Sequence, residues 1–201
     1  MLESKGMIGL GMFSMAAHDY LARSPIRSLA DFKGKKIRVN ATPIEREAMA
    51  RLGASAAPMP LNEVMPALQR GVIDGTRSAL SVLNAFKYYD ASKTATVIND
   101  TILIPVAMIS KIFMDKLPAD LRSAVLASGK AAQKRNKEWA NAFHAGMRDK
   151  WKAAGGEIFV MPEAERQKIL ALLKSVGDDV TASQPPVKAM LETVRATAAK
   201  Y

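Results

Sequence analysis

Arg38 is the residue of this sequence whose type and position best fit a chemical role, and that role is anion binding. Residues 36–40 alternate between polar and apolar side chains, which predicts a strand with Arg38 near its C-terminal end. In open α/β sheets, ligands bind beyond the carboxyl ends of strands. A guanidinium there can hold a carboxylate through two parallel hydrogen bonds, and a following helix N-terminus adds donors and partial positive charge. A surface arginine on an edge strand is the alternative, and spacing alone leaves both open.

Signals for catalysis are weak. The two histidines, His18 and His144, lie far apart in the sequence, and acidic residues are scattered rather than paired. Nucleophile-elbow, zinc-helix and phosphate-loop motifs are absent from the sequence. The pair Gly9 and Gly11 lacks the third glycine of a dinucleotide fingerprint, and the lack of cysteine excludes thiolate chemistry. We therefore expect no enzymatic activity, no metal site and no cofactor.

Composition is that of a folded protein with an excess of positive charge. Hydrophobic residues make up 49% of the 201 residues, enough for one large domain or two small ones. The formal charge of +10 favours anionic partners, namely nucleic acid, anionic lipid or small carboxylates. Solubility alone would also explain this charge. The basic residues are spread along the chain rather than packed in one run, which argues against nucleic-acid binding and leaves it only as the alternative function. No apolar run reaches the roughly 18 residues of a membrane span. The first residues also lack a secretory signal, so we expect either a removed signal or a start partway through a longer gene.

The helix expected after Arg38 has clear boundary signals. Thr42 is a plausible N-cap, Pro43 suits the first helical position, and Glu45 completes a Thr-x-x-Glu capping box. Gly53 follows the last residues of the helical pattern and suits its C-terminal end.

Strands and helices are predicted to alternate along the rest of the chain. A second helix is expected with Asn62 as its N-cap, and Pro105 interrupts one of the later strands. This alternation predicts an α/β fold with a sheet of mainly parallel neighbours. The further predicted strands are 56–59, 102–109 and 157–160, and residues 72–75 are expected to lead into another short strand or a turn. The further predicted helices are 81–89, 118–154 and two more after residue 160.

The helix predicted over 118–154 would extend about 50 Å, longer than a small domain is wide. Trp139, Phe143, Met147 and Trp151 fall at intervals of four and form one apolar stripe. We interpret this stripe as core packing rather than as a cofactor site.

Three segments together resemble the solute-binding proteins of TRAP transporters, the DctP family. The segments are SLADFKGKKIRV (28–39), LGASAAPM (52–59) and EVMPALQRGVIDG (63–75), and each stands at the spacing typical of the family. The long helix after residue 118 fits as well, and the resemblance covers most of residues 20–180.

The resemblance implies a periplasmic-binding-protein-like α/β fold of the type II flytrap kind, with the ligand between two lobes and a long helix spanning them. It also implies a periplasmic protein that captures a small organic acid and passes it to TRAP membrane permease subunits. The implied division is 1–22 as a strand and hinge segment, 23–95 as the second lobe, 96–154 as the remaining first-lobe strand with the long helix, and 155–201 as a C-terminal strand and helices packed on the second lobe.

The resemblance also assigns ligand contacts. Arg38 stands where the family places the arginine that pairs with the ligand carboxylate. Ser78 occupies a position that often carries an asparagine contact, and Leu61 one that packs on the ligand. Asn40 lies next to the site. A site of one arginine, one leucine and one serine suits a monocarboxylate with an apolar body.

Further positive or polar side chains are candidates for the ligand site. Some family members carry a second arginine where this chain has His18, and Tyr20 or Arg23 would take that place if the register shifts. Arg77 is interpreted either as an additional positive group of the site or as an exposed charge.

The first lobe is expected to be incomplete. Family members carry roughly one hundred further residues before the equivalent of Met7, about the size of a small domain. Half of the cleft wall would then be missing, although closure of both lobes is what excludes water from the bound charge. The sequence therefore predicts that this chain alone binds weakly or not at all, and that it exposes apolar surface that favours association.

Overall fold

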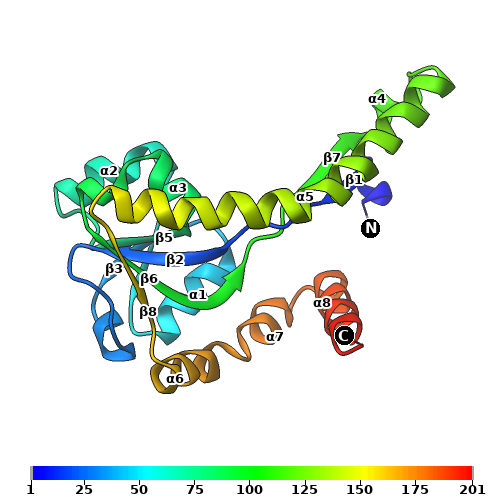
Figure 1. Cartoon of the computed structure of the whole chain (residues 1–201). Helices are drawn as coiled ribbons and strands as arrows, with labels where there is room; N and C mark the ends of the chain where they lie inside the picture. Colours follow the sequence, from blue (N-terminus) through cyan, green and yellow to red (C-terminus); the bar gives the residue numbers. More distant parts are fainter. Residues whose placement is uncertain (1, 201) are drawn as a thin grey trace.

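The strands of the computed structural model, which describes residues 2–200 apart from the side chain of residue 137, form two separate sheets. A six-stranded sheet has the order β4-β3-β5-β2-β6-β8, and a two-stranded sheet pairs β1 with β7 (Figure 1). The strands are β1 (Met7–Met12), β2 (Ala17–Ala22), β3 (Lys36–Val39), β4 (Ser55–Pro58), β5 (Gly75–Ala79), β6 (Thr94–Ile102), β7 (Val106–Ser110) and β8 (Glu157–Val160).

Helices cover both faces of the six-stranded sheet, and one long helix extends from it to the small sheet (Figure 1). The helices are η1 (Glu3–Lys5), η2 (Leu29–Phe32), α1 (Pro43–Arg51), α2 (Leu61–Gln69), α3 (Leu80–Ala85), η3 (Tyr88–Asp90), α4 (Lys111–Asp115), α5 (Ala119–Ala153), α6 (Glu163–Leu173), α7 (Val176–Thr181) and α8 (Pro185–Ala198).

The six-stranded sheet is mixed, which confirms the α/β class. β3 pairs in parallel with β4 and β5, and β6 pairs in parallel with β8, as the alternating pattern predicts. The central strand β2 differs, because it runs antiparallel to both β5 and β6. It enters the sheet directly from β1 with no crossover helix, so its direction is set by this entry rather than by a strand–helix–strand unit.

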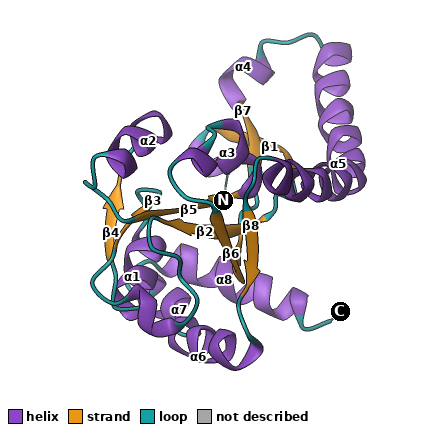
Figure 2. Cartoon of the chain, turned by 60° about the vertical axis from the view of Figure 1, so that its left-hand side comes forward, coloured by secondary structure: helices purple, strands orange, loops and turns teal. Residues whose placement is uncertain are grey.

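Each face of the six-stranded sheet has its own hydrophobic core. One core joins residues of β3 such as Ile37 to Met49 of α1 and Ile169 of α6. The other joins Leu21 of β2 to residues of α2 and α3 and to Trp151 of α5. We call the two sides of the sheet that carry these cores the α1 face and the α3 face. Figure 2 shows helices on both sides of the sheet.

The boundary of α1 follows the predicted signals. Thr42 is the N-cap, since its Oγ1 accepts a hydrogen bond from the backbone N–H of Glu45 at 3.2 Å, and Pro43 is the first helical residue. Only this half of the predicted capping box forms, because the Glu45 carboxylate accepts the backbone N–H of Asn40 instead of that of Thr42. The helix ends with Gly53 in the left-handed region at φ +77°.

Several other predicted boundaries are wrong. The helix α2 begins at Leu61 with Pro60 as its N-cap residue, so Asn62 lies inside the first turn and is not the cap. The predicted strand 102–109 is two strands, because β6 ends in the large sheet and β7 begins in the small one. Pro105 lies between them, where its missing N–H interrupts no ladder. The predicted helix 81–89 is α3 followed by η3, and three helices follow β8 instead of two.

The long helix α5 confirms the prediction for 118–154, but its apolar stripe is only half buried. Met147 and Trp151 are 7% and 0% exposed and pack on the α3 face, whereas Trp139 and Phe143 are 60% and 37% exposed. The core-packing interpretation is therefore wrong for Trp139 and Phe143, because α5 extends from the six-stranded sheet towards the two-stranded sheet (Figure 1). Further out the helix crosses β1 so closely that a Cβ at Gly129 would lie 2.5 Å from the Leu10 carbonyl oxygen.

None of the helices that the structure describes combines the length and the apolar character needed to span a membrane.

The two tryptophans of α5 provide a matched test of this arrangement. Trp151 is fully buried and its Nε1 donates to the carbonyl oxygens of Lys93 and Glu157 at 3.1 and 3.0 Å. We expect Trp151→Ala to lower the free energy of unfolding by about 3–5 kcal/mol, since it removes a core aromatic. Trp139→Ala, on the same helix and mostly exposed, should cost no more than about 1 kcal/mol. Urea denaturation followed by circular dichroism measures both values. Equal losses would contradict the packing described here.

Candidate anion-binding site

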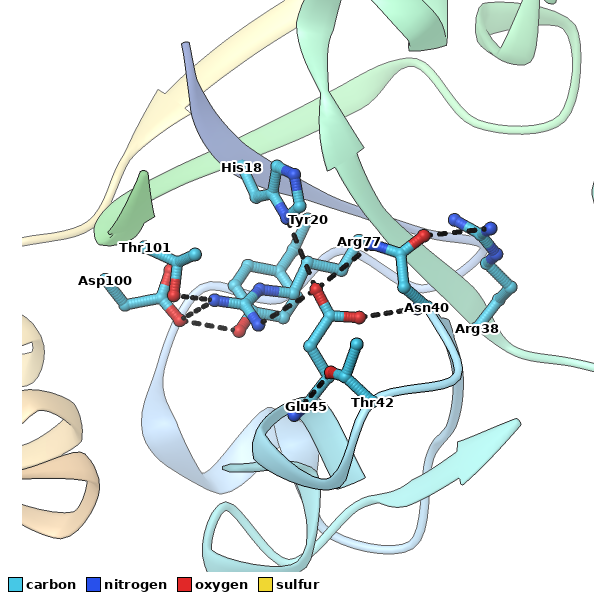
Figure 3. Close-up of polar contacts among 9 residues, drawn as sticks. All are labelled: His18, Tyr20, Arg38, Asn40, Thr42, Glu45, Arg77, Asp100 and Thr101. Carbon is cyan, nitrogen blue, oxygen red and sulfur yellow. Dashed lines mark hydrogen bonds and ion pairs between the residues drawn. The ribbon is translucent and has the colours of Figure 1, made fainter. Parts of the chain in front are cut away.

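The predicted site residues gather along one edge of the six-stranded sheet. At this edge β3 and β5 end, β2 begins, and β6 ends, since β2 runs opposite to its neighbours. Arg38, Asn40, Ser78 and His18 all belong to these strand ends or to the residues that follow them. Figure 3 shows the polar side chains of this edge.

Strand alternation divides the edge between the two faces of the sheet. Arg38 pairs with Thr76, two residues before Ser78, so Arg38 and Ser78 point to the α3 face. Arg77 pairs with Tyr20 and points with it to the α1 face, as does His18. The structure thus brings Arg38, Asn40 and Ser78 to one face and places Arg77 and His18 on the other.

Arg77 is a buried cation whose charge is already neutralised. Its guanidinium is 2% exposed and donates from Nη2 to Asp100 Oδ2 at 2.7 Å and to the hydroxyl of Thr101. Its Nη1 lies 3.8 Å from a carboxylate oxygen of Glu45. Burial alone would lower the pKa of Arg77, but Tyr20, Asp100 and Glu45 reverse this and raise it. The interpretation of Arg77 as an exposed charge is therefore wrong.

Asp100 was not found from the sequence, because its contact with Arg77 spans three strands. It also accepts a hydrogen bond from the Tyr20 hydroxyl at 2.9 Å, and the Tyr20 ring lies 5.4 Å from the Arg77 guanidinium carbon. Both polar and aromatic surfaces of Tyr20 are thus committed to Arg77 and Asp100. Arg23, the other alternative, follows β2 at the opposite end of that strand.

His18 is neutral at neutral pH. Its side chain is 3% exposed, and burial first, then the charge of Arg77, lowers its pKa to about 4. Its Nδ1 lies 3.7 Å from Glu45 Oε1, without a hydrogen-bond partner among the described residues. His18 therefore brings no positive charge to the edge at neutral pH. It differs in this from the arginine that the resemblance implies for some family members at this position.

Arg38, unlike Arg77, is buried beside neutral hydrogen-bond partners instead of carboxylates. It is 4% exposed, its Nε donates to the Met59 carbonyl oxygen at 3.0 Å, and its Nη2 donates to Asn40 Oδ1 at 3.3 Å. Within residues 2–200 no carboxylate forms an ion pair with Arg38 and no hydrogen bond involves its Nη1. Burial lowers the pKa of Arg38, yet an arginine remains charged. A cation with so little contact with water and no ion-pair partner is costly, and its hydrogen bonds to two neutral groups offset only part of this cost.

Asn40 links the two faces of the edge. Its backbone N–H donates to Glu45 Oε2 at 2.5 Å, and its side-chain Nδ2 donates to Glu45 Oε1 at 3.2 Å. Its amide oxygen accepts from Arg38 on the other side. The Asn40 side chain therefore lies between the carboxylate of Glu45 and the guanidinium of Arg38 (Figure 3).

The remaining predicted residues, Leu61 and Ser78, differ in their hydrogen bonds. The backbone oxygen of Leu61 accepts the Tyr88 hydroxyl at 2.9 Å. Tyr88 was missed by the sequence. It is fully buried, and burial raises its pKa against the opposing charge of Arg38. Ser78 is 6% exposed, and no hydrogen bond of its hydroxyl is found among the described residues.

Asp19 is a second residue that the sequence did not indicate. It pairs with Ser78 across β2 and β5 and is 5% exposed. Burial raises its pKa to about 7, against the opposing charge of Arg148. It lines a cavity of about 130 Å³ together with Asn99, His144 and Arg148, where β2, β6 and α5 meet.

No group of three or more acidic, histidine or cysteine side chains placed to hold a metal ion occurs in the part of the chain that the structure describes.

Comparison with known proteins decides the family. The sequence model described as bacterial extracellular solute-binding protein, family 7 (DctP) matches residues 1–184. The chain belongs to this family. The match ends just before α8 (Pro185–Ala198), which lies outside it. None of the comparisons supports the nucleic-acid alternative.

Relatives in family 7 match most of the chain. A solute-binding protein of Sulfitobacter sp. is 29% identical over 98% of this chain and 59% of its own length. The C4-dicarboxylate-binding periplasmic protein DctP of Rhodobacter capsulatus is 36% identical over 62% of this chain and 37% of its own. This chain thus spans well under two thirds of the length of these relatives.

Solved structures show the same fold, and members of this structural group have the two-lobed type II architecture. A TRAP periplasmic solute-binding protein from Xanthobacter autotrophicus, with bound β-D-galacturonate, superposes with a TM-score of 0.87. It is 29% identical, and the match covers 96% of this chain and 64% of that one. A protein from Desulfovibrio salexigens with bound orotic acid gives a TM-score of 0.91 at 20% identity, covering 99% of this chain and 65% of that one.

The two shifted acid–base groups of the edge predict opposite pH dependences of stability. The pKa of Asp19 is about 7 when folded and 3.8 when unfolded, so Asp19 lowers stability as pH rises between these values. The pKa of His18 is about 4 when folded and 6.5 when unfolded, so His18 raises stability as pH rises over that window. Each contributes at most about 1.4 kcal/mol per pH unit, and the two largely cancel.

Single substitutions should separate the two contributions. Relative to the parent, Asp19→Asn should gain stability as pH rises from about 4 to about 7, and His18→Gln should lose it from about 4 to about 6.5. Urea denaturation at several pH values measures these differences. Curves that stay parallel to the parent would show that the two groups titrate normally.

Proposed function

We propose that this chain is the ligand-binding part of an extracytoplasmic solute-binding protein that captures a small organic acid, with Arg38 as the group that holds the carboxylate. The observation that supports this most is the buried Arg38 charge without an ion-pair partner among the described residues. Its Nη1 and the remaining hydrogen of Nη2 match the two oxygens of a carboxylate. A bound acid would supply the anion that the fold omits.

The other residues that we assign to the ligand lie on the same face as Arg38 or at its edge. Asn40 orients the guanidinium, the hydroxyl of Ser78 is free to bond a polar group, and Leu61 would contact the body of the acid. The buried Tyr88 would hold Leu61 in place through the hydrogen bond to its backbone oxygen. Family 7 relatives are solute-binding proteins, which supports a binding rather than a catalytic role.

His18 and Arg77 are better explained as structural residues of the α1 face than as residues that contact the ligand. Both lie on the α1 face. The charge of Arg77 is paired with the carboxylates of Asp100 and Glu45, and His18 is uncharged at neutral pH. Among the described residues of these strand ends, Arg38 is then the buried arginine without an ion-pair partner, and a single such cation favours an acid with a single carboxylate. The galacturonate bound to the Xanthobacter relative is such an acid and is the first to test, with succinate as a dicarboxylate for comparison.

We also propose that the two sheets belong to two lobes. In this division 1–22 is a strand and hinge segment, 23–95 the second lobe, 96–154 the first-lobe strand with the long helix, and 155–201 the C-terminal part packed on the second lobe. An open apolar groove of about 560 Å³ between β1, α4 and α5 supports it, because this is surface that a fuller lobe would cover. In the periplasm, such a protein would deliver its acid to TRAP permease subunits.

Ligand binding tests this function directly. Heteronuclear NMR titration of the chain with D-galacturonate detects affinities in the millimolar range, which we expect for a site lacking a complete second wall. Arg38→Ala should weaken binding at least about tenfold, since it removes a charge-assisted bidentate contact. Arg46→Ala, an exposed arginine on α1, is the matched control and should leave the affinity unchanged.

Two results would contradict the proposal. One is an affinity that Arg38→Ala leaves unchanged or lowers no more than Arg46→Ala does. The other is the absence of saturable shifts with any acid of a panel that includes galacturonate, glucuronate and succinate.

A further inference from the structure

The contact that sets the direction of Arg38 is itself fixed from the opposite face of the sheet. Asn40 accepts from Arg38 through Oδ1 and donates to Glu45 through both its backbone N–H and its Nδ2. Glu45 is 7% exposed and lies on the α1 face, beside Arg77 and His18. A chain of hydrogen bonds therefore runs from Glu45, which lies beside Arg77 and His18 on one face, through Asn40 to the Arg38 guanidinium on the other.

An amide side chain has two ends of opposite hydrogen-bonding character. An ionised carboxylate only accepts, so Glu45 holds the NH₂ end of Asn40 and the oxygen end faces Arg38. If the amide turned over, its NH₂ group would face the N–H groups of Arg38, and two donors would meet. The guanidinium would then have to rotate away to find an acceptor, because unpaired buried donors are costly.

We propose that Glu45 is a positioning residue for ligand binding: through Asn40 it fixes the direction of the Arg38 guanidinium without touching the ligand. This inference rests on the proposed function and adds a residue that neither the sequence pattern nor the resemblance assigned to the site. Glu45 has a separate role as the N3 residue of α1, where its backbone N–H binds Thr42. That role uses a different atom and can be tested apart.

Glu45→Gln is the variant that probes the carboxylate. Glutamine keeps the size of the side chain but brings an NH₂ group, which favours the turned-over amide of Asn40. We expect the affinity for D-galacturonate to fall about tenfold, the loss of one well-aligned hydrogen bond to a charged group. Asn40→Ala removes the link and should cause a similar loss.

A double-mutant cycle separates positioning from general loosening. If Glu45 acts through Asn40, the double variant Glu45→Gln with Asn40→Ala should bind about as weakly as either single variant. Additive losses, about a hundredfold together, would overturn the proposal. Thr42→Ala is the control. It removes the helix cap and lowers the melting temperature, while Asn40 keeps its hydrogen bonds with Arg38 and with Glu45. Its affinity should equal that of the parent, and a loss like that of Glu45→Gln would also overturn the proposal.

A measurement without ligand keeps the inference separate from the proposed function. Exchange of the Arg38 Nε–H with water reports the bond to the Met59 carbonyl, which needs the observed guanidinium direction. Exchange should be slow in the parent and in Thr42→Ala and at least tenfold faster in Glu45→Gln and Asn40→Ala. Equal rates in the parent and Glu45→Gln would overturn the positioning role even if no acid binds. Failure of every acid to bind, with the exchange pattern as expected, would refute only the proposed function.

Discussion

A guanidinium removed from water must meet an anion, and this requirement organises the edge of the six-stranded sheet. Two arginines on adjacent strands, Arg38 and Arg77, are buried there to a similar degree. Arg77 is surrounded by Asp100, Glu45 and the Tyr20 ring, and its charge is answered within the chain. Arg38 has a carbonyl and an amide as partners and no carboxylate among the described residues. The difference between the two explains why we assign the ligand to one and structural support to the other.

The fold produces this difference through the simplest property of a strand, the alternation of its side chains. Arg38 and Arg77 differ by one position in register across β3 and β5, so they point to opposite faces. The antiparallel strand β2 then places Tyr20 beside Arg77 and Asp19 beside Ser78. One face thus holds Arg77 with its carboxylate partners, and the other holds Arg38 without an ion-pair partner among the described residues. Asn40, which follows the end of β3, connects them.

Local sequence signals predicted the parts of the site that depend on neighbours in the chain. The strand carrying Arg38 and the cap of α1 at Thr42 were correct, because alternation and capping are read within a few residues. Tyr88 and Asp100 were missed, because their contacts come from distant strands and helices and leave no pattern in the sequence. The interpretation of Arg77 as an exposed charge failed for the same reason. The exposed Trp139 shows that an apolar stripe fixes a helix but not how much of it a partner covers.

The central claim, that Arg38 and not Arg77 holds the carboxylate, is tested most directly by arginine side-chain NMR. The guanidinium resonances of both residues can be followed during titration with acetate, the smallest probe with this group, against sodium chloride at equal ionic strength. The account predicts saturable shifts and slowed rotation for Arg38 with acetate alone, and no change for Arg77. Shifts confined to Arg77, or equal effects of acetate and chloride on Arg38, would contradict it.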